Sequence, residues 1–203
     1  ARAPAGPLPR NAMYHNQGDG TFVETTDQTR TGDTGYGMGA AVGDPDNDGD
    51  PDLYVTNYGP NVFFRNDGNG IFTDITAATG TGDPGWGANA AFVDYDNDGD
   101  LDLYVANYMD FRVEQNRECF QSTARAYCGP TAYPGQSGVL YRNDGDLRFT
   151  DVTRASGLYW TEGRQLGAVF GDYDGDGDQD LFIPNDRTPN CLFENNGDGT
   201  FTE

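Results

Sequence analysis

The chain lacks lysine, has one histidine and three cysteines among its 203 residues, and contains no apolar run of 18 residues. Without such a run, the sequence predicts no membrane-spanning helix and no membrane insertion. His15 and the scattered cysteines form no cluster of soft ligands, so a zinc site is not expected. Twelve basic residues, all arginine, stand against 33 acidic ones and give a net charge of −21. So acidic a chain is expected to avoid nucleic acid and to attract cations.

The cysteines and the N-terminus bear on the compartment in which the chain works. Cys119 and Cys128 are close enough in sequence to bridge a small loop, and Cys191 is left over. A disulfide between the first two would imply an oxidising compartment; the alternative is that all three are reduced and simply packed. No signal peptide is visible, and the opening ARAPAGPLPR is compatible with a mature N-terminus left after cleavage.

The acidic residues are concentrated in three windows that share one pattern. Fifteen of the 33 lie in DPDNDGDPD (44–52), DYDNDGDLD (94–102) and DYDGDGDQD (172–180). Numbered from its first residue, each window has Asp at positions 1, 3, 5, 7 and 9 and Gly at position 6. The acidic residues are thus concentrated in short windows, whereas on an ordinary solvent-exposed face they would be spread over the surface.

Two motifs alternate along the chain, and this repetition decides the architecture. The first is an apolar run, the Asp window and a short strand-forming run such as Leu53–Val55. The second is a hairpin with a polar glycine turn, as in FFRNDGNGIFTDIT (63–76). Together the two motifs predict about four short antiparallel strands in each repeat.

The predicted fold is an all-β, β-propeller-like array of four-stranded antiparallel blades forming one repeat domain. We expect an N-terminal arm and half repeat at 1–30, a blade at 31–80, a blade at 81–158 with an insert at about 109–137, and a blade at 159–203. The chain opens with half a repeat and stops at GTFTE, in mid-pattern. About three and a half repeats are too few to close a propeller, so we expect either an open array or closure against neighbouring copies.

The spacing of the aspartates predicts about three calcium sites. Alternating carboxylates on a tight loop converge on one point, and glycine at position 6 permits the sharp turn. Position 7 (Asp50, Asp100 and Asp178) is expected to offer its carbonyl, with its side chain pointing outward. The expected carboxylate ligands occupy positions 1, 3, 5 and 9: Asp44, Asp46, Asp48 and Asp52; Asp94, Asp96, Asp98 and Asp102; and Asp172, Asp174, Asp176 and Asp180.

Two other interpretations of these windows are less consistent with the sequence. An EF-hand needs a glutamate at position 12 and flanking helices, whereas position 12 is Val55, Val105 or Ile183, each in a predicted strand. Acidic turns without metal would not explain three windows that share the same glycine, the same ninth aspartate and the same following strand. Calcium is favoured over magnesium because a flexible, carboxylate-rich loop suits the larger ion.

The segment GAVFGDYDGDGDQDLFIPND (167–186) resembles the FG-GAP/VCBS repeat, a calcium-binding blade motif of propeller proteins such as integrin α-subunits. Its pairing with LYRNDGDLRFTDVTRASGL (140–158) resembles, more narrowly, the cartilage acidic protein and ASPIC/UnbV family. The resemblance covers about residues 12–203. It implies a calcium-stabilised, extracellular or cell-surface β-propeller used in adhesion or as a scaffold.

The sequence favours a structural or adhesive calcium-binding module over an enzyme. The aspartates are committed to the loops by their spacing, and no serine lies in a nucleophile-elbow pattern. One alternative is a carbohydrate- or receptor-binding module that uses Tyr36, Trp86, Trp160 and the insert, although such tryptophans more often pack in a core. The other is an accessory propeller domain of a larger secreted enzyme. Partners other than calcium would be further copies of the chain or an extracellular protein or glycan.

Overall fold

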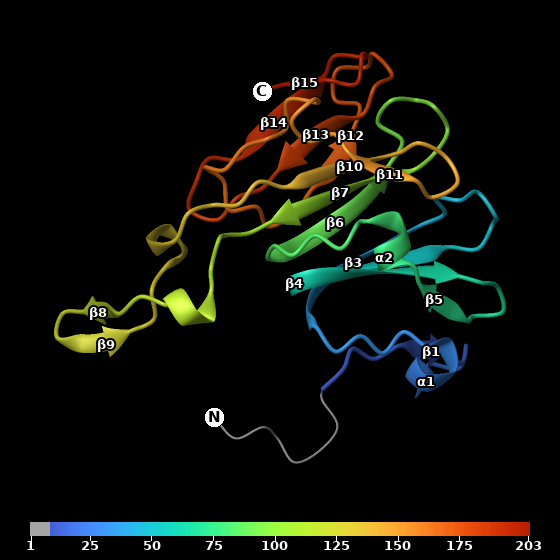
Figure 1. Cartoon of the computed structure of the whole chain (residues 1–203), viewed down its shortest axis with the longest axis horizontal. Helices are drawn as coiled ribbons and strands as arrows, with labels where there is room; N and C mark the ends of the chain where they lie inside the picture. The colour runs from blue at the N-terminus through green and yellow to red at the C-terminus, as the bar shows by residue number, and fades with distance from the viewer. Residues whose placement is uncertain (1–8) are drawn as a thin grey trace.

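The computed structural model describes residues 9–203, so the opening residues 1–8 of the predicted arm lie outside the described part. The fold is all-β, with three larger antiparallel sheets and two two-stranded hairpins (Figure 1). The two α-helices, α1 (Thr26–Thr29) and α2 (Thr76–Thr79), are single turns. Within residues 9–203, no helix is long and apolar enough to cross a membrane.

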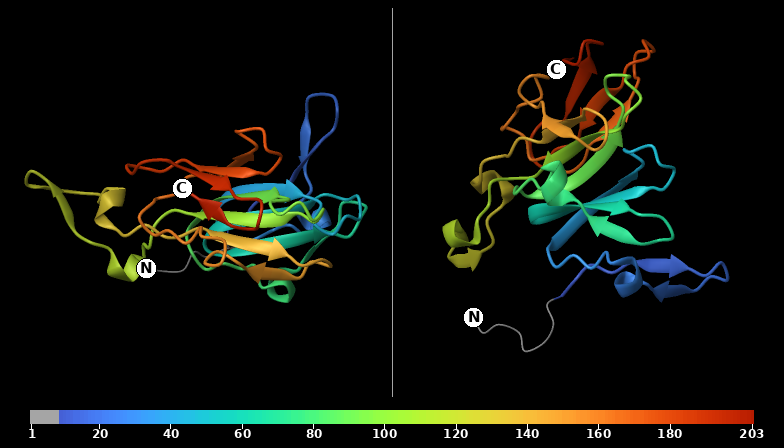
Figure 2. Two further views of the ribbon diagram at one scale, coloured as in Figure 1. Left: turned by 90° about the horizontal axis from the view of Figure 1, so that it is seen from above. Right: turned by 45° about the vertical axis from the view of Figure 1, so that its right-hand side comes forward.

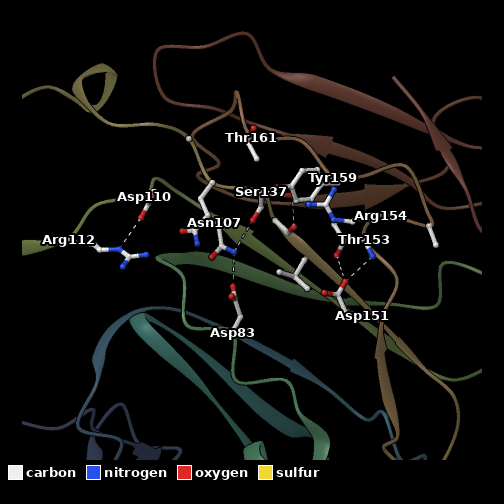
Figure 3. Close-up of a pocket in the computed structure, with 15 residues that line it drawn as sticks. Asp83, Asn107, Asp110, Arg112, Ser137, Asp151, Thr153, Arg154, Tyr159 and Thr161 are labelled. Atoms are coloured by element: carbon white, nitrogen blue, oxygen red, sulfur yellow. Dashed lines mark hydrogen bonds and ion pairs between the residues drawn. The ribbon is translucent and has the colours of Figure 1, made fainter. Parts of the chain in front are cut away.

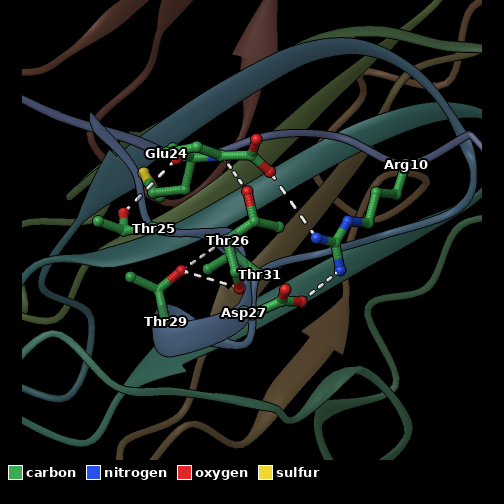
Figure 4. A network of polar contacts seen from close by, with 8 residues as sticks. Arg10, Glu24, Thr25, Thr26, Asp27, Thr29 and Thr31 are labelled. Atoms are coloured by element: carbon green, nitrogen blue, oxygen red, sulfur yellow. Dashed lines mark hydrogen bonds and ion pairs between the residues drawn. The ribbon is translucent and has the colours of Figure 1, made fainter. Parts of the chain in front are cut away.

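The described chain begins with half a repeat. Strands β1 (Tyr14–Asn16) and β2 (Phe22–Glu24) form a hairpin, and α1 follows it directly. Polar contacts join hairpin and helix: Arg10 pairs with Asp27, and the Met13 amide donates to Thr26 Oγ1 at 2.9 Å (Figure 4). Since the same threonine contact recurs at Thr76 and Thr153 in later repeats, this hairpin belongs to the repeat pattern.

The first blade consists of β3 (Tyr36–Gly43), β4 (Asp52–Asn66) and β5 (Phe72–Asp74) in the order β3-β4-β5. The Asn66 amide donates to Asp52 Oδ1 at 2.7 Å, so the two ends of the 15-residue β4 lie together. The chain doubles back near Gly59, whose φ of 101° is readily adopted only by glycine. β4 thus takes the place of two strands.

The second blade has the order β11-β10-β7-β6. Its strands are β6 (Gly87–Val93), β7 (Asp102–Asn107), β10 (Val139–Asn143) and β11 (Phe149–Asp151). The insert lies between β7 and β10 and projects to the left in Figure 1. It comprises two 3₁₀ turns, at Val113–Gln115 and Pro130–Ala132, and the hairpin of β8 (Cys119–Gln121) and β9 (Ala124–Ala126).

The third blade is complete, with the order β12-β13-β14-β15. Its strands are β12 (Val169–Gly171), β13 (Asp180–Ile183), β14 (Cys191–Asn195) and β15 (Phe201–Thr202). The expectation that the last residues stop in mid-pattern is therefore wrong, because GTFTE supplies the fourth strand. In the described chain, the half repeat is at the N-terminal side, and the two ends are not complementary halves of one blade.

The core lies between successive blades. Residues from the first and second blades form one cluster, which includes Tyr54, Phe63 and Leu103. Residues from the second and third form another, which includes Tyr104 and Leu181. Strand β6 contacts β3 and β4 on one side and β12 on the other, so the sheets succeed one another face to face (Figure 2). Each blade therefore depends on its neighbours for burial.

Candidate metal loops

The three Asp windows form loops at equivalent places, each leading into the second strand of a blade. We call residues 44–52, 94–102 and 172–180 the first, second and third loop. Position 4 is left-handed in all three, with φ of 56° at Asn47, 58° at Asn97 and 86° at Gly175. The glycine at position 6 has φ between 92° and 101°, which explains why no other residue stands there.

The aspartate at position 1 holds each loop in its curved shape. Asp44 accepts hydrogen bonds from the amides of Asp48 (3.1 Å) and Gly49 (2.9 Å). Asp94 and Asp172 make the corresponding bonds in the other two loops. These bonds bend the backbone back toward the first carboxylate, so the alternate side chains converge.

Each loop brings three carboxylates together, with oxygens that lie within 4.8 Å of one another. Four were expected from the spacing, and the membership differs between loops. Position 5 belongs to the group only in the first loop, whereas position 9 belongs to it in the second and third. The groups are Asp44, Asp46 and Asp48; Asp94, Asp96 and Asp102; and Asp172, Asp174 and Asp180.

Buried carboxylate oxygens without partners show that the first two loops suit a cation. Among the described residues, Oδ1 of Asp46, Oδ1 of Asp96 and Oδ2 of Asp52 are buried and accept no hydrogen bond. Asp52 is only 1% exposed. Its Oδ2 is unpaired because position 2 is Pro45, which has no N–H, whereas the amides of Tyr95 and Tyr173 bond the equivalent oxygens. Unpaired buried carboxylate oxygens fit a hard cation such as Ca²⁺.

The raised pKa values of several loop carboxyls also indicate that the loops suit a cation. Desolvation by burial, with repulsion from neighbouring aspartates, raises the pKa of Asp52 to about 7 and that of Asp102 to about 7. Burial, followed by repulsion from the neighbouring loop carboxylates, also raises the pKa of Asp46 and of Asp96. Such carboxyls are costly to ionise without a cation, and a bound cation would relieve that cost.

The aspartate at position 9 has a structural role that its spacing alone did not indicate. Oδ1 of Asp52, Asp102 and Asp180 accepts the backbone N–H of an asparagine that starts the hairpin turn, at 2.7, 2.8 and 2.8 Å. These asparagines are Asn66, Asn143 and Asn195. An asparagine recurs at this place in every hairpin, and this recurrence is the sequence feature from which the contact with position 9 could have been predicted.

In two loops the side chain at position 7 contacts a neighbouring loop. Asp100 Oδ1 accepts a hydrogen bond from Asn47 Nδ2 at 2.9 Å, and Asp178 Oδ1 accepts one from Asn97 Nδ2 at 2.7 Å. Each of these two side chains points out of its own loop and contacts the preceding loop. Asp50 is exposed. Sequence reasoning missed Asn47 and Asn97, although both occupy position 4.

The candidate aromatic face divides into exposed and packed residues. Tyr36 is 76% exposed, with its ring 6.3 Å from that of Tyr58. Trp86 is half-buried between Tyr58 and Tyr108, at centroid distances of 5.1 and 5.2 Å. Trp160 is half-buried against the core between the second and third blades. The two tryptophans thus pack within the protein, and Tyr36 is the accessible member of the set.

The insert is anchored to the blades at its base. Cys119 and Cys128 form a disulfide, with Cα atoms 5.1 Å apart. Arg164, from the segment before β12, donates to the carbonyl oxygens of Pro130 (2.8 Å) and Tyr133 (2.6 Å). Cys191 is a free thiol in the core, where burial raises its pKa to about 11. Cys191 therefore packs in the core as a small apolar residue does.

A pocket of about 610 Å³ lies near the ends of the second blade's strands, beside the base of the insert (Figure 3). It is lined by polar groups from several segments, and Asn107 donates there to Asp83 (2.7 Å) and to the Ser137 carbonyl (3.0 Å). Arg154 lies over the ring of Tyr159 at 3.4 Å. This pocket is separate from the three loops.

Comparison with known proteins identifies the repeats. The model of the FG-GAP-like repeat family matches residues 5–55, 44–105 and 131–183, which together make up most of the chain. The chain belongs to the FG-GAP repeat family. The matched segments of this FG-GAP protein include all three Asp loops: 5–55 contains the first, 44–105 the first and second, and 131–183 the third. The narrower relation to the cartilage acidic protein and ASPIC/UnbV family stays a prediction.

Among solved structures, the FG-GAP chain is similar to a lectin of Agrocybe aegerita that specifically recognises non-reducing terminal N-acetylglucosamine. The TM-score is 0.44 and the identity 18%, over 79% of this chain and 36% of the lectin chain. The protein described here therefore spans about a third of the length of that lectin. No curated protein sequence matches the chain.

Proposed function

We propose that the chain is an extracellular or cell-surface calcium-binding module with a structural or adhesive role and no catalytic one. The observation that carries the proposal is the trio of converging carboxylates in each loop, with buried oxygens of Asp46, Asp52 and Asp96 that have no partner in the described chain. Bound calcium would neutralise mutually repelling carboxylates and so favour the folded state. The disulfide of the insert supports an oxidising location.

The expected stabilisation is large relative to the stability of an ordinary domain. Extracellular modules bind calcium with Kd values of roughly 10⁻⁴–10⁻³ M. In about 1 mM calcium, a site with a Kd of about 10⁻⁴ M adds about 1.4 kcal/mol, and three such sites add about 4 kcal/mol. For a chain of this size, about 4 kcal/mol corresponds to a shift in Tm of roughly 8–16 °C.

The test compares thermal unfolding in about 1 mM CaCl₂ with unfolding in excess EDTA. We expect the Tm to fall by about 10 °C on chelation. Magnesium at the same concentration is the control and should restore little, because Mg²⁺ gives up its water ligands reluctantly. An unchanged Tm in EDTA would refute the proposed role of calcium.

Assembly through open faces belongs to the same proposal, and one observation supports it. The outer face of the third blade exposes Phe182 (40%) and Leu192 (41%), whereas the equivalent Tyr104 and Leu140 of the second blade are fully buried by the third. Light scattering in calcium would show association of the chain through such a face. A particle that stays at 22.0 kDa would exclude it.

A second candidate is a carbohydrate- or receptor-binding module. The polar pocket of Figure 3 favours it, since sugar sites combine polar groups with accessible aromatic rings, and Tyr159 in the lining is 47% exposed. Tyr36 is a further accessible ring that does not line this pocket. Glycan-array binding that is lost on Tyr36→Ala or Arg154→Ala, without a change in Tm, would support this candidate. If the chain binds no glycan on the array, the carbohydrate-binding candidate is wrong and the structural proposal remains.

A further inference from the structure

The first two loops are joined to the blade that follows each of them. Asn47 in the first loop donates to Asp100 in the second, and Asn97 in the second donates to Asp178 in the third. In the opposite direction, the side chain of Asn143 donates to the Pro45 carbonyl, and that of Asn195 donates to the Tyr95 carbonyl, both at 2.8 Å. Each of these two loops therefore lies across a boundary between blades.

These contacts form part of a continuous series of hydrogen bonds from one loop to the next. The backbone amide of Asp100 donates to Asp98 Oδ1 at 2.9 Å. Asn47 is therefore linked, through Asp100, to Asp98, a predicted ligand that lies beside the second loop's group of three carboxylates but outside it. Asp178 and Asp176 repeat the arrangement in the third loop. A contiguous network of this kind can carry energetic coupling between sites.

The geometry of position 4 explains why a cation would act on this network. Asn47 lies between Asp46 and Asp48, two carboxylates of the first group, and its left-handed backbone turns its side chain toward the neighbouring blade. A cation that holds the flanking carboxylates in place also restrains Asn47. By linkage, the contact with Asp100 then favours the loop conformation that binds the cation.

We propose that Asn47 and Asn97 are positioning residues that couple calcium binding in the first two loops to the stacking of neighbouring blades. The third loop accepts the contact from Asn97 through Asp178, but it has Gly175 at position 4 and, within residues 9–203, donates no such contact to a further loop. The inference rests on the proposed calcium function and deepens it. Calcium is then a link between blades as well as a stabiliser of single loops.

The test is a calorimetric titration of CaCl₂ into the chelator-treated full chain, with Asn47→Gly and Asn97→Gly as variants. Glycine removes the amide without straining the left-handed position and reproduces the residue found in the third loop. We expect the affinity of one loop in each variant to fall about 5–10-fold. The rise in Tm caused by calcium should shrink, while the Tm in EDTA should change much less.

The matched control is Asn69→Gly. Asn69 is exposed in a hairpin turn with φ of 56°, the same backbone geometry as Asn47, and lies outside the loops. Its calcium affinities should equal those of the unmodified chain. If Asn47→Gly and Asn97→Gly also bind calcium within twofold of the unmodified chain, the coupling is wrong and the calcium function stands. If the unmodified chain binds no calcium, the proposed function and this inference are both wrong.

Discussion

The second and third loops have nearly the same sequence but different surroundings. Position 2 is tyrosine in both, and Tyr95 is 3% exposed whereas Tyr173 is 55% exposed. The backbones agree closely: position 6 has φ of 93° in one and 101° in the other, and position 9 bonds the same hairpin amide. The motif thus determines the loop itself, and the next blade determines whether the loop is buried and tied down.

The largest effect expected from this comparison concerns the two tyrosines. Tyr95 packs across the blade boundary against Phe201, at a centroid distance of 5.9 Å. Tyr95→Ala removes a buried ring from that interface and should lower the free energy of unfolding by about 3 kcal/mol. Tyr173→Ala removes a largely exposed ring and should cost less than about 0.5 kcal/mol. Urea denaturation of both variants measures the difference.

Equal losses for Tyr95→Ala and Tyr173→Ala would contradict the comparison, because they would mean that the third blade does not cover the second loop. Tyr95→Phe is the control. It keeps the ring and should leave the stability close to that of the unmodified chain, since the Tyr95 hydroxyl makes no hydrogen bond within the described chain.

A further effect is expected from pH in the calcium-free chain. Asp52 and Asp102 have pKa values raised to about 7 in the folded state, above the ordinary value of 3.8. The folded state therefore holds protons that the unfolded state releases, and stability falls as pH rises from about 4 to about 7. We expect a loss of several kcal/mol over this range in EDTA, measured by urea denaturation.

The control for this pH dependence removes the two titrating groups. Because an asparagine side chain cannot titrate, Asp52→Asn and Asp102→Asn should flatten the fall in stability between pH 4 and pH 7. Saturating calcium should also flatten it, because a bound cation favours the ionised carboxylates. A calcium-free stability that rises over the same range would show that these two carboxyls are not the dominant buried acids.

The sequence predicted the repeats and the curved loops because these are local properties. Asp at alternate positions and glycine at position 6 require only a few neighbouring residues, and the hairpins follow from their polar glycine turns. The contacts of Asn47 with Asp100 and of Asn143 with Pro45 join residues 53 and 98 positions apart. Nothing in the local pattern specifies which blade lies beside which loop, so these contacts and the buried state of Tyr95 had to come from the structure.

The smallest effect is expected from giving the third loop the asparagine of the other two. Gly175 has a left-handed φ of 86°, which asparagine tolerates better than most residues, so Gly175→Asn should fold normally. No Asp of a following blade is available within residues 9–203 to accept a bond from the new amide. Stability should then change by less than about 0.5 kcal/mol, and calcium affinity by less than twofold, measured by thermal unfolding and calorimetry. A several-fold gain in affinity would show that asparagine at position 4 acts within its own loop, and that the contact between blades is not what distinguishes the first two loops from the third.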